Sequence, residues 1–391
     1  MNFCGIICEF NPFHNGHEYI IQEAKKQTNA EIVCVMSGDF MQRGEPAIED
    51  KYSRAKKAIS AGANAVLELP TIYACSNAEN FAYGAIKILN AIGAKYVAFG
   101  VENTTLEILK TVAKLKYENS VTFQNNFKNE IENGINFNTA LKRSISKTLN
   151  DKNVLKILEK PNNILAVEYL TAILKLKSQI IPIAINRCDD GYYETVNKGK
   201  FLSASGIRNK IFNGENYDEF IPKNAKLDTF FNKNHIKTLK TLQILKIKQT
   251  PEKELELFYD YSEGIEYRIK KMCNNYSSFD EIVSNIVSPR YRMARVNKLM
   301  LYPLLVVTKK VIQKSKTTKP CAKVLAIEKN NKELLKISKQ KINLIVSNND
   351  YNSLNKNQNE IINIDLNAST IYNTIFDNKL SSDKKIGTMF L

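Results

Sequence analysis

The chain has 391 residues, 43% of them hydrophobic and 25% charged, which is the composition of a globular protein with room for two or three domains. No run approaches the ~20 apolar residues of a membrane span, and the apolar run near the N-terminus lacks the preceding basic residues of a signal peptide. The seven cysteines show no C-x-x-C pair, which argues against a disulfide scaffold and a zinc site and predicts a cytoplasmic protein.

The net charge of +16 is divided unevenly along the chain. Residues 1–200 hold 24 basic and 21 acidic side chains, whereas residues 201–391 hold 32 and 19. The first half therefore has the balance of an enzyme domain, and the second half is electropositive. This asymmetry favours a polyanionic partner, with nucleic acid ahead of a membrane surface, and a general bias toward Lys and Asn is the alternative.

The first hundred residues alternate between short apolar runs and helical patterns. This alternation predicts βαβ units and a parallel sheet with right-handed crossovers. After a polar, Asn-rich insertion at 119–150, a helix at 162–175 and a strand at 179–186 continue it. The predicted strands of the first part are residues 3–8, 31–36, 64–69 and 95–99, and the predicted helices are 16–28, 50–62, 77–92 and 104–117.

From about residue 214 this alternation stops. Residues 217–310 predict helices with basic faces, and the segment 309–341 holds eleven lysines and two glutamates, which would attract phosphate without sequence preference. Strands predicted at 342–346 and 361–364 indicate a small closing α/β portion. The predicted fold class is α/β, with a parallel-sheet, Rossmann-like catalytic domain (1–213), a basic, mainly helical domain (214–310) and a small C-terminal domain (311–391).

The sequence Phe-Asn-Pro-Phe-His-Asn-Gly-His at residues 10–17 follows the first strand and holds two of the three histidines. A strand, a tight turn and a helix N-terminus together present backbone N–H groups to an anion. His14 and His17 can add donors to the same phosphate. A metal pair is the alternative, but no carboxylate or cysteine cluster lies nearby, so no metal site is predicted.

Residues 203–208 open a later predicted helix with two hydroxyls, Ser203 and Ser205, and the guanidinium of Arg208. A serine before a helix is most often only a cap. Paired with the histidine motif at the other end of one α/β domain, the segment predicts a second phosphate clamp.

Two further polar groups follow the predicted strands. For the first group, recognition of a substrate and an ion-paired loop–helix junction are both open. For the second group, pocket lining and a structural role are both open. The first comprises Arg43, Gly44, Glu45, Asp50, Lys51 and Arg54, and the second comprises Glu68, Ser76, Asn77 and Glu79.

A basic stretch in the second half interleaves cations with an aromatic side chain. On a helix, Tyr291, Arg295 and Lys298 would share a face, which suits phosphate contacts and base stacking. A solvated basic helix is the alternative. The predicted RNA-binding residues are Arg290, Tyr291, Arg292, Arg295 and Lys298.

The early HxGH and late Ser-x-Ser-x-x-Arg motifs together resemble the nucleotidyltransferase superfamily. Six ordered blocks narrow the resemblance to the tRNA(Met) cytidine acetate ligase family, densely over residues 1–210 and weakly through EGIEYRI and SPRYRMARVNKLMLY. The blocks are GIICEFNPFHNGH, VMSGDFMQRGEPAIEDKYSRA, GANAVLELP, FGVEN, PNNILAVEYL and SASGIR.

This resemblance implies a nucleotidyltransferase fold and a two-step reaction. ATP, with Mg²⁺, activates acetate as acetyl-adenylate with release of pyrophosphate. The wobble cytidine of elongator tRNA(Met) then takes the acetyl group, giving N4-acetylcytidine. A small-molecule adenylyltransferase is the alternative, but it leaves the basic second half without a role. A non-catalytic RNA-binding protein is a third possibility.

The resemblance also implies which residues form the site. The catalytic group would be His14, His17, Ser203, Ser205 and Arg208. Asp39 stands where the family commonly has Asn, which places an extra negative charge near the expected polyphosphate. The implied ATP contacts are Ile7, Cys8, Glu9, Phe10, Asn11, Pro12, Phe13, His14, Asn15, Gly16, His17, Glu18, Tyr19, Ile20, Gly100, Asn162 and Arg187.

Overall fold

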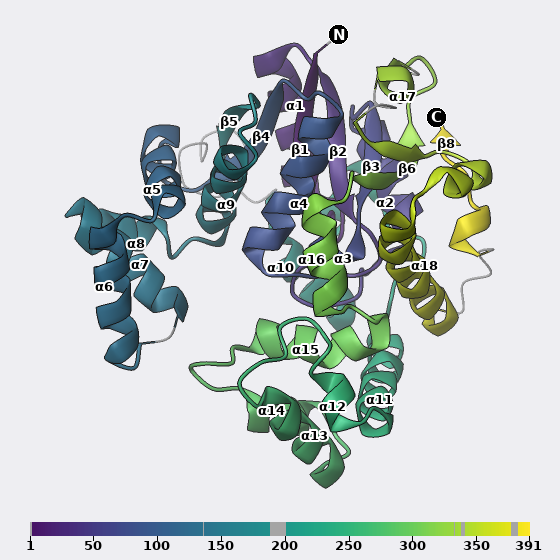
Figure 1. Ribbon diagram of the computed structural model, residues 1–391. Coiled ribbons are helices and arrows are strands. Elements are labelled where there is room, and N and C mark those ends of the chain that lie inside the picture. Colours follow the sequence, from purple (N-terminus) through teal and green to yellow (C-terminus); the bar gives the residue numbers. More distant parts are fainter. Residues whose placement is uncertain (1, 136, 188–200, 332, 338–340, 377–381) are drawn as a thin grey trace.

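A computed structural model describes residues 2–135, 137–187, 201–331, 333–337, 341–376 and 382–391 (Figure 1). Its centre is one sheet with the strand order β5-β4-β1-β2-β3-β6-β7, to which β8 adds by pairing with β6. The strands are β1 (Phe3–Cys8), β2 (Glu31–Ser37), β3 (Ala65–Leu69), β4 (Tyr96–Val101), β5 (Ile181–Asn186), β6 (Cys321–Ile327), β7 (Asn343–Ile345) and β8 (Met389–Phe390).

The five strands predicted in the first 186 residues all form, and all five run parallel. β6 runs antiparallel to β3, so a strand from the C-terminal part extends the sheet of the catalytic part. In a parallel sheet the carboxyl ends of the strands share one edge, which is where ligands bind in such folds.

Helices cover both faces of the sheet. Alternate side chains of β2 divide between the two faces: Cys34 packs with the cluster that includes α1 and α2, and Val35 with the cluster that includes α4 and α9. The helices of this part are α1 (Asn15–Thr28), α2 (Lys51–Ser60), α3 (Thr71–Ala74), α4 (Ala78–Ala91), α5 (Leu106–Glu118), α9 (Pro161–Lys175) and α10 (Ala204–Asn213).

The polar insertion and the residues just after it form an arm of three helices beside α5, to one side of the sheet (Figure 1). These helices are α6 (Val121–Glu132), α7 (Phe137–Leu149) and α8 (Asn153–Ile157).

A helical region follows, as predicted, and lies opposite one end of the sheet (Figure 1). α15 is the helix of this region that reaches the strand ends, since Lys298 bonds to the carbonyl of Ser76 at 2.9 Å. The helices are α11 (Lys233–Gln249), α12 (Glu252–Leu255), α13 (Ile265–Asn275), α14 (Phe279–Ile286) and α15 (Met293–Leu305).

The C-terminal part contains α16 (Lys309–Thr317), α17 (Glu333–Ile337) and α18 (Lys356–Ile375). The strand predicted at 361–364 is wrong, because these residues lie within α18, where Ile361, Ala368 and Tyr372 are buried at helical spacing. The lysine-rich segment 309–341 contains α16, β6 and α17. Every residue of β6 within it is buried, including Lys323.

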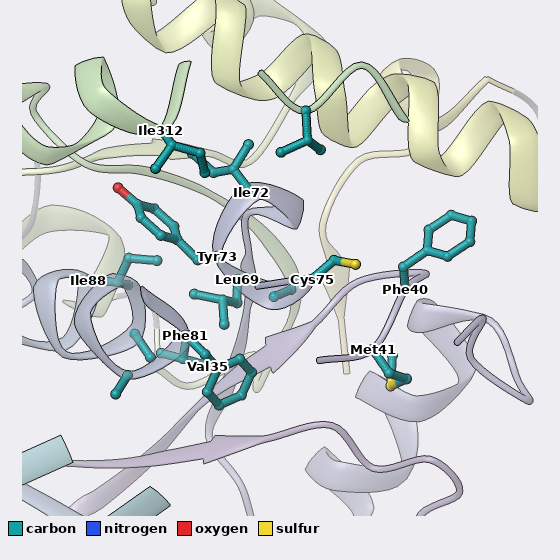
Figure 2. Close-up of a cluster of buried hydrophobic side chains, with 14 of the residues drawn as sticks. Val35, Phe40, Met41, Leu69, Ile72, Tyr73, Cys75, Phe81, Ile88 and Ile312 are labelled. Carbon is teal, nitrogen blue, oxygen red and sulfur yellow. The ribbon is translucent and has the colours of Figure 1, made fainter. Parts of the chain in front are cut away.

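A buried apolar cluster joins the three predicted parts of the chain at the strand ends. Figure 2 shows Tyr73 between Ile88 of α4 and Ile312 of α16, with Leu69 and Ile72 beside them, and all five belong to this cluster. The same cluster continues into α11, α13 and α15. The boundaries at residues 213 and 310 stay predictions, and across them the apolar core is continuous.

Short 3-10 turns lie at Asp218–Phe220, Lys223–Ala225, Asn348–Ser353 and Asp383–Lys385. Six cysteines of the described chain are buried free thiols. Within the described ranges, every helix is too short or too polar for a membrane crossing.

Candidate active site

The first turn of α1 holds both histidines of the HNGH motif in fixed orientations. The Nδ1 atom of His14 accepts a hydrogen bond from the backbone N–H of Gly16 at 3.1 Å. The Nδ1 atom of His17 accepts one from the backbone N–H of His14 at 3.2 Å. Because a neutral imidazole that accepts at Nδ1 carries its proton on Nε2, each ring is set as an Nε2–H donor.

The two imidazoles are stacked, with 3.6 Å between the ring centroids. The ring of His17 also packs against Phe10 at 4.8 Å and Phe13 at 5.7 Å. Burial, and next the charges of His14 and Arg187, lower the pKa of His17 well below its ordinary value. His17 is therefore a neutral hydrogen-bond donor at neutral pH, and it becomes a cation only at lower pH or beside an added anion.

The loop between β1 and α1 is anchored from two directions. Phe10 is fully buried and adopts a left-handed backbone with φ of 50°. Next to it, the side-chain oxygen of Asn11 accepts a hydrogen bond from the backbone N–H of Ile48 at 2.7 Å. Its carbonyl accepts another from Arg208 of α10, also at 2.7 Å. The helix dipole and N–H groups of α1 thus occupy a fixed place at the strand end.

α10 begins beside α1. Ser203 caps α10, since its Oγ accepts from the backbone N–H of Gly206 at 3.2 Å, and Ser205 Oγ lies 3.1 Å away. Both serines are exposed. A Cβ atom built on Gly16 would lie 4.0 Å from the ring of Phe201, which directly precedes α10. The structure therefore brings the two predicted phosphate motifs together, with both helix N-termini at the same edge.

The remaining predicted ATP contacts lie at the ends of β4 and β5. Gly100 pairs with Ile185, and a Cβ at Gly100 would lie 3.2 Å from Cγ of Arg187. Asn162 donates to the carboxylate of Glu102, directly after β4. Gly100, Asn162 and Arg187 therefore lie at the same edge of the sheet as the start of α1.

Arg54 is a structural tie between strand ends. It is fully buried and donates to the backbone carbonyls of Glu9 at 2.6 Å and Ser37 at 3.0 Å, and to that of Gly38. The sequence left two interpretations open for the group that contains Arg54, substrate recognition and a loop–helix junction. The contacts of Arg54 are those of a loop–helix junction. One carboxylate oxygen of Glu9 accepts from the backbone N–H of Gln42 at 2.7 Å, and burial raises the pKa of Glu9.

Lys51 is the centre of a buried charge network. Its Nζ lies 2.8 Å from Glu68, 3.1 Å from Asp383 and 3.6 Å from Asp39. Although burial disfavours the ammonium, these carboxylates hold the pKa of Lys51 well above its ordinary value. Asp39 also accepts from Ser369 Oγ. Asp39 is thus buried and paired inside this network, with Lys51 and Ser369 as its partners.

Sequence reasoning missed the part played by the C-terminal residues in this network. Ser369 of α18 and Asp383 complete it, and Asp365 accepts from the backbone N–H of Thr71 at 2.6 Å. A signal was present in the sequence, because Asp365 is a lone acid on the apolar face made by Ile361, Ala368 and Tyr372. Reading that segment as a strand concealed the pattern.

Comparisons with known proteins agree with this fold. A family model described as HIGH Nucleotidyl Transferase matches residues 1–386. The tRNA(Met) cytidine acetate ligase of Clostridium novyi (strain NT) is 34% identical over 403 residues, covering 100% of both chains. That of Acetivibrio thermocellus is 36% identical over 362 residues, covering 87% of this chain and 86% of its own.

Two solved structures are similar over their whole length. The apo crystal structure of Thermotoga maritima TmcAL has a TM-score of 0.90 and 28% identity, with 100% of each chain covered. The same protein bound with alpha-thio ATP has a TM-score of 0.89 and 27% identity, also with 100% of each chain covered. The chain belongs to the tRNA(Met) cytidine acetate ligase family.

The predicted RNA-binding residues of this family member do not form one helical stripe. α15 begins at Met293, so Arg290, Tyr291 and Arg292 precede the helix, and their placement on it is wrong. The RNA-binding role itself stays a prediction.

The five predicted RNA-binding residues differ in how far their side chains are exposed. Tyr291 and Lys298 are 6% and 7% exposed. Arg295 makes two bonds to the carboxylate of Asp260, at 2.8 and 2.9 Å. Arg290 and Arg292 remain exposed, and Arg290 pairs with Glu263.

Several strand-end residues of this ligase-family chain have structural partners. Ser76 accepts at its carbonyl from Gln42 and Lys298, both at 2.9 Å, and Asn77 caps α4. Glu79 pairs with Lys175. Within the described residues, no three His, Cys, Asp or Glu side chains are grouped so as to hold a metal ion.

A groove of about 470 Å³ lies between α11 and α14, away from the residues discussed above. Lys233, Lys237 and Lys240 line it along one face of α11. Lys240 pairs with Asp280 at 2.6 Å, whereas Lys233 and Lys237 are exposed and do not pair with that carboxylate. The groove adds positive surface to the helical region.

Proposed function

We propose that this protein activates acetate with ATP and transfers the acetyl group to a cytidine of tRNA(Met). The observation that carries the proposal is the meeting of two helix N-termini at the carboxyl edge of the sheet, where Arg208 donates to Asn11 at 2.7 Å. Support comes from the related T. maritima structure bound with alpha-thio ATP, and from relatives named for acetate and tRNA(Met).

In the first step, a carboxylate oxygen of acetate attacks the α-phosphorus of ATP. The new O–P bond forms as the bond to the β-phosphate oxygen breaks, and pyrophosphate leaves. Little acid–base help is needed, so the protein acts by positioning and by neutralising charge. Neutral His17 supplies an N–H donor, and the N-termini of α1 and α10, with Ser203 and Arg208, face the phosphates.

Magnesium would arrive with the phosphates of ATP. We assign it no protein site, and it would add to the neutralisation of the leaving pyrophosphate. Arg187 and Asn162 would contact the nucleoside side of ATP, at the ends of β5 and β4.

In the second step, the exocyclic nitrogen of the wobble cytidine of elongator tRNA(Met) attacks the acetyl carbonyl carbon. The C–N bond forms, the C–O bond to phosphate breaks, AMP leaves and the nitrogen loses a proton. A cytosine amine is a weak nucleophile, which is the physical reason for using a mixed anhydride. Arg290, Arg292 and the lysines of α11 offer positive surface for the RNA backbone.

A small-molecule adenylyltransferase would bind ATP phosphates at the same place, between the N-termini of α1 and α10. That activity would leave the excess of 32 basic over 19 acidic residues in 201–391 without a role. The two functions make different products, so one assay separates them.

The test incubates the full chain with ATP, labelled acetate and total tRNA, and measures both pyrophosphate release and N4-acetylcytidine by mass spectrometry. We expect pyrophosphate release that depends on acetate, and label in tRNA(Met). Pyrophosphate release without acetate, with AMP joined to a small molecule, would support the adenylyltransferase instead. ATP binding without pyrophosphate release would support a non-catalytic RNA-binding protein.

A further inference from the structure

The loop of residues 40–46 is held rigidly at the strand ends. Phe40 and Pro46 form an antiparallel bridge, and the backbone N–H of Met41 donates to the carbonyl of Glu45 at 2.8 Å. The turn closes with the N–H of Gly44 donating to Met41 at 3.0 Å. A loop closed on itself in this way presents its tip residue from a fixed backbone.

Three neighbouring parts of the protein fix this loop from outside. The backbone N–H of Gln42 donates to Glu9, inside the predicted ATP-binding stretch, at 2.7 Å. Glu45 pairs with Arg208 of α10 at 3.3 Å. Gly44 has φ of 81°, and a Cβ there would lie 3.0 Å from the backbone nitrogen of Lys298, so only glycine allows this contact with α15.

Arg43 lies between these anchored residues and is exposed. The chain has nine arginines, and the other eight all have a hydrogen bond, an ion pair or an electrostatic partner. Among the residues that the structure describes, no partner of Arg43 is found. Arg43 therefore holds a guanidinium with no paired carboxylate among the described residues, beside the proposed ATP site at the starts of α1 and α10. Such a group is available to a ligand with negative charge.

We propose that Arg43 binds a backbone phosphate of the RNA substrate next to the nucleotide that is acetylated. The inference rests on the proposed function, and it adds a specific anchor for the RNA. An enzyme that acts on a base must draw that base out of its stack, and a phosphate clamp beside it holds the strand in place. The loop lies where the ATP-binding stretch meets α15 of the electropositive helical region.

An RNA phosphate suits Arg43 better than the two small anions of the reaction. The phosphates of ATP are already faced by two helix N-termini and by the histidine pair. Acetate is a small monoanion, and an exposed, hydrated guanidinium would hold it only weakly. A polynucleotide gains affinity from several such contacts together through release of counterions.

The test compares Arg43→Gln and Arg43→Lys in the full chain with Lys26→Gln, a variant of a side chain that is 80% exposed at the far end of α1. Binding of tRNA(Met) is measured over a range of salt concentrations. Acetate-dependent exchange of pyrophosphate into ATP is measured without RNA.

We expect Arg43→Gln to weaken tRNA binding by about 10-fold and to lower the slope of log affinity against log salt by about 1. Arg43→Lys should recover part of the affinity, Lys26→Gln should match the wild type, and the exchange reaction should keep its KM for acetate. Unchanged RNA affinity and salt slope would overturn the proposal. A raised KM for acetate in the exchange reaction would overturn it in favour of carboxylate recognition.

The binding measurement does not depend on acetyl transfer. If the wild type binds tRNA but forms no acetylcytidine, the proposed function fails, and the salt slope still reports on Arg43.

Discussion

His17 accepts a hydrogen bond from the backbone N–H of His14 at 3.2 Å, so the second histidine of the motif closes the first turn of α1. The same arrangement occurs at the start of α11, where His235 accepts from the backbone N–H of Asn232 at 3.1 Å. These two capping boxes use all three histidines as structural acceptors, because His14 Nδ1 also accepts from the backbone N–H of Gly16. Only the first of them lies at the corner formed by β1 and the start of α1.

This pair gives a matched test of the catalytic role of His17. The variant His17→Ala should lower acetate-dependent pyrophosphate exchange by about 100-fold or more, because it removes a phosphate donor. The variant His235→Ala should leave the exchange near the wild-type rate. Each should lose about 1 kcal/mol of unfolding free energy from its cap, measured by urea denaturation. Equal activity in the two variants would remove His17 from the mechanism, and tRNA binding should survive in both.

The network around Lys51 predicts a large loss of stability. Lys51→Met should lower the free energy of unfolding by about 3–5 kcal/mol, because Asp39 and Glu68 would lose their cation and Asp383 would keep only Lys323, at 3.3 Å. The control is Lys56→Met on the same helix, where the side chain is exposed. Urea denaturation measures both. A loss of less than about 1 kcal/mol for Lys51→Met would show that the carboxylates rearrange or take up protons at little cost.

Asp365 predicts a pH dependence. Burial, and next the charge of Glu68, raise the pKa of Asp365 to about 8 from an ordinary value of 3.8. Between those values the folded state holds a proton that the unfolded state has lost. Stability contributed by Asp365 is therefore complete below about pH 4 and is lost as pH rises toward 8.

The variant Asp365→Asn keeps an oxygen for the N–H of Thr71 and does not titrate. Its unfolding free energy relative to the wild type should rise with pH between 4 and 8, by at most about 1.4 kcal/mol per unit, and level off above 8. Chemical denaturation at four pH values measures the difference. Parallel curves for the two proteins would contradict a raised pKa for Asp365.

Local sequence signals predicted the corner formed by β1, the turn after it and the start of α1. β1, the HNGH turn and the start of α1 are contiguous in sequence, so their geometry follows from strand, turn and capping preferences of neighbouring residues. The link between this corner and α10 was also predicted, from the pairing of two motifs. Its actual contact, from Arg208 to the carbonyl of Asn11, depends on the folded chain.

The parts that sequence reasoning missed depend on contacts between distant segments. Arg54 was a candidate for substrate recognition, but its charge is satisfied by three carbonyls from the ends of β1 and β2. Lys298 was a candidate for RNA contact, but it is buried against the carbonyl of Ser76. Neither burial follows from periodicity, because the partner lies 16 to 222 residues away.

Val306 predicts a stabilising substitution. This β-branched residue ends α15 in a left-handed conformation with φ of 62°, and its side chain is 49% exposed. Glycine adopts that conformation without strain, so Val306→Gly should raise the unfolding free energy by about 1 kcal/mol, measured by urea denaturation. Gly214 supplies the reverse experiment, because it ends α10 with φ of 72° and nothing lies within 4 Å of its missing Cβ. Gly214→Val should cost a similar amount from the backbone alone, and a neutral result in both variants would contradict strain at these helix ends.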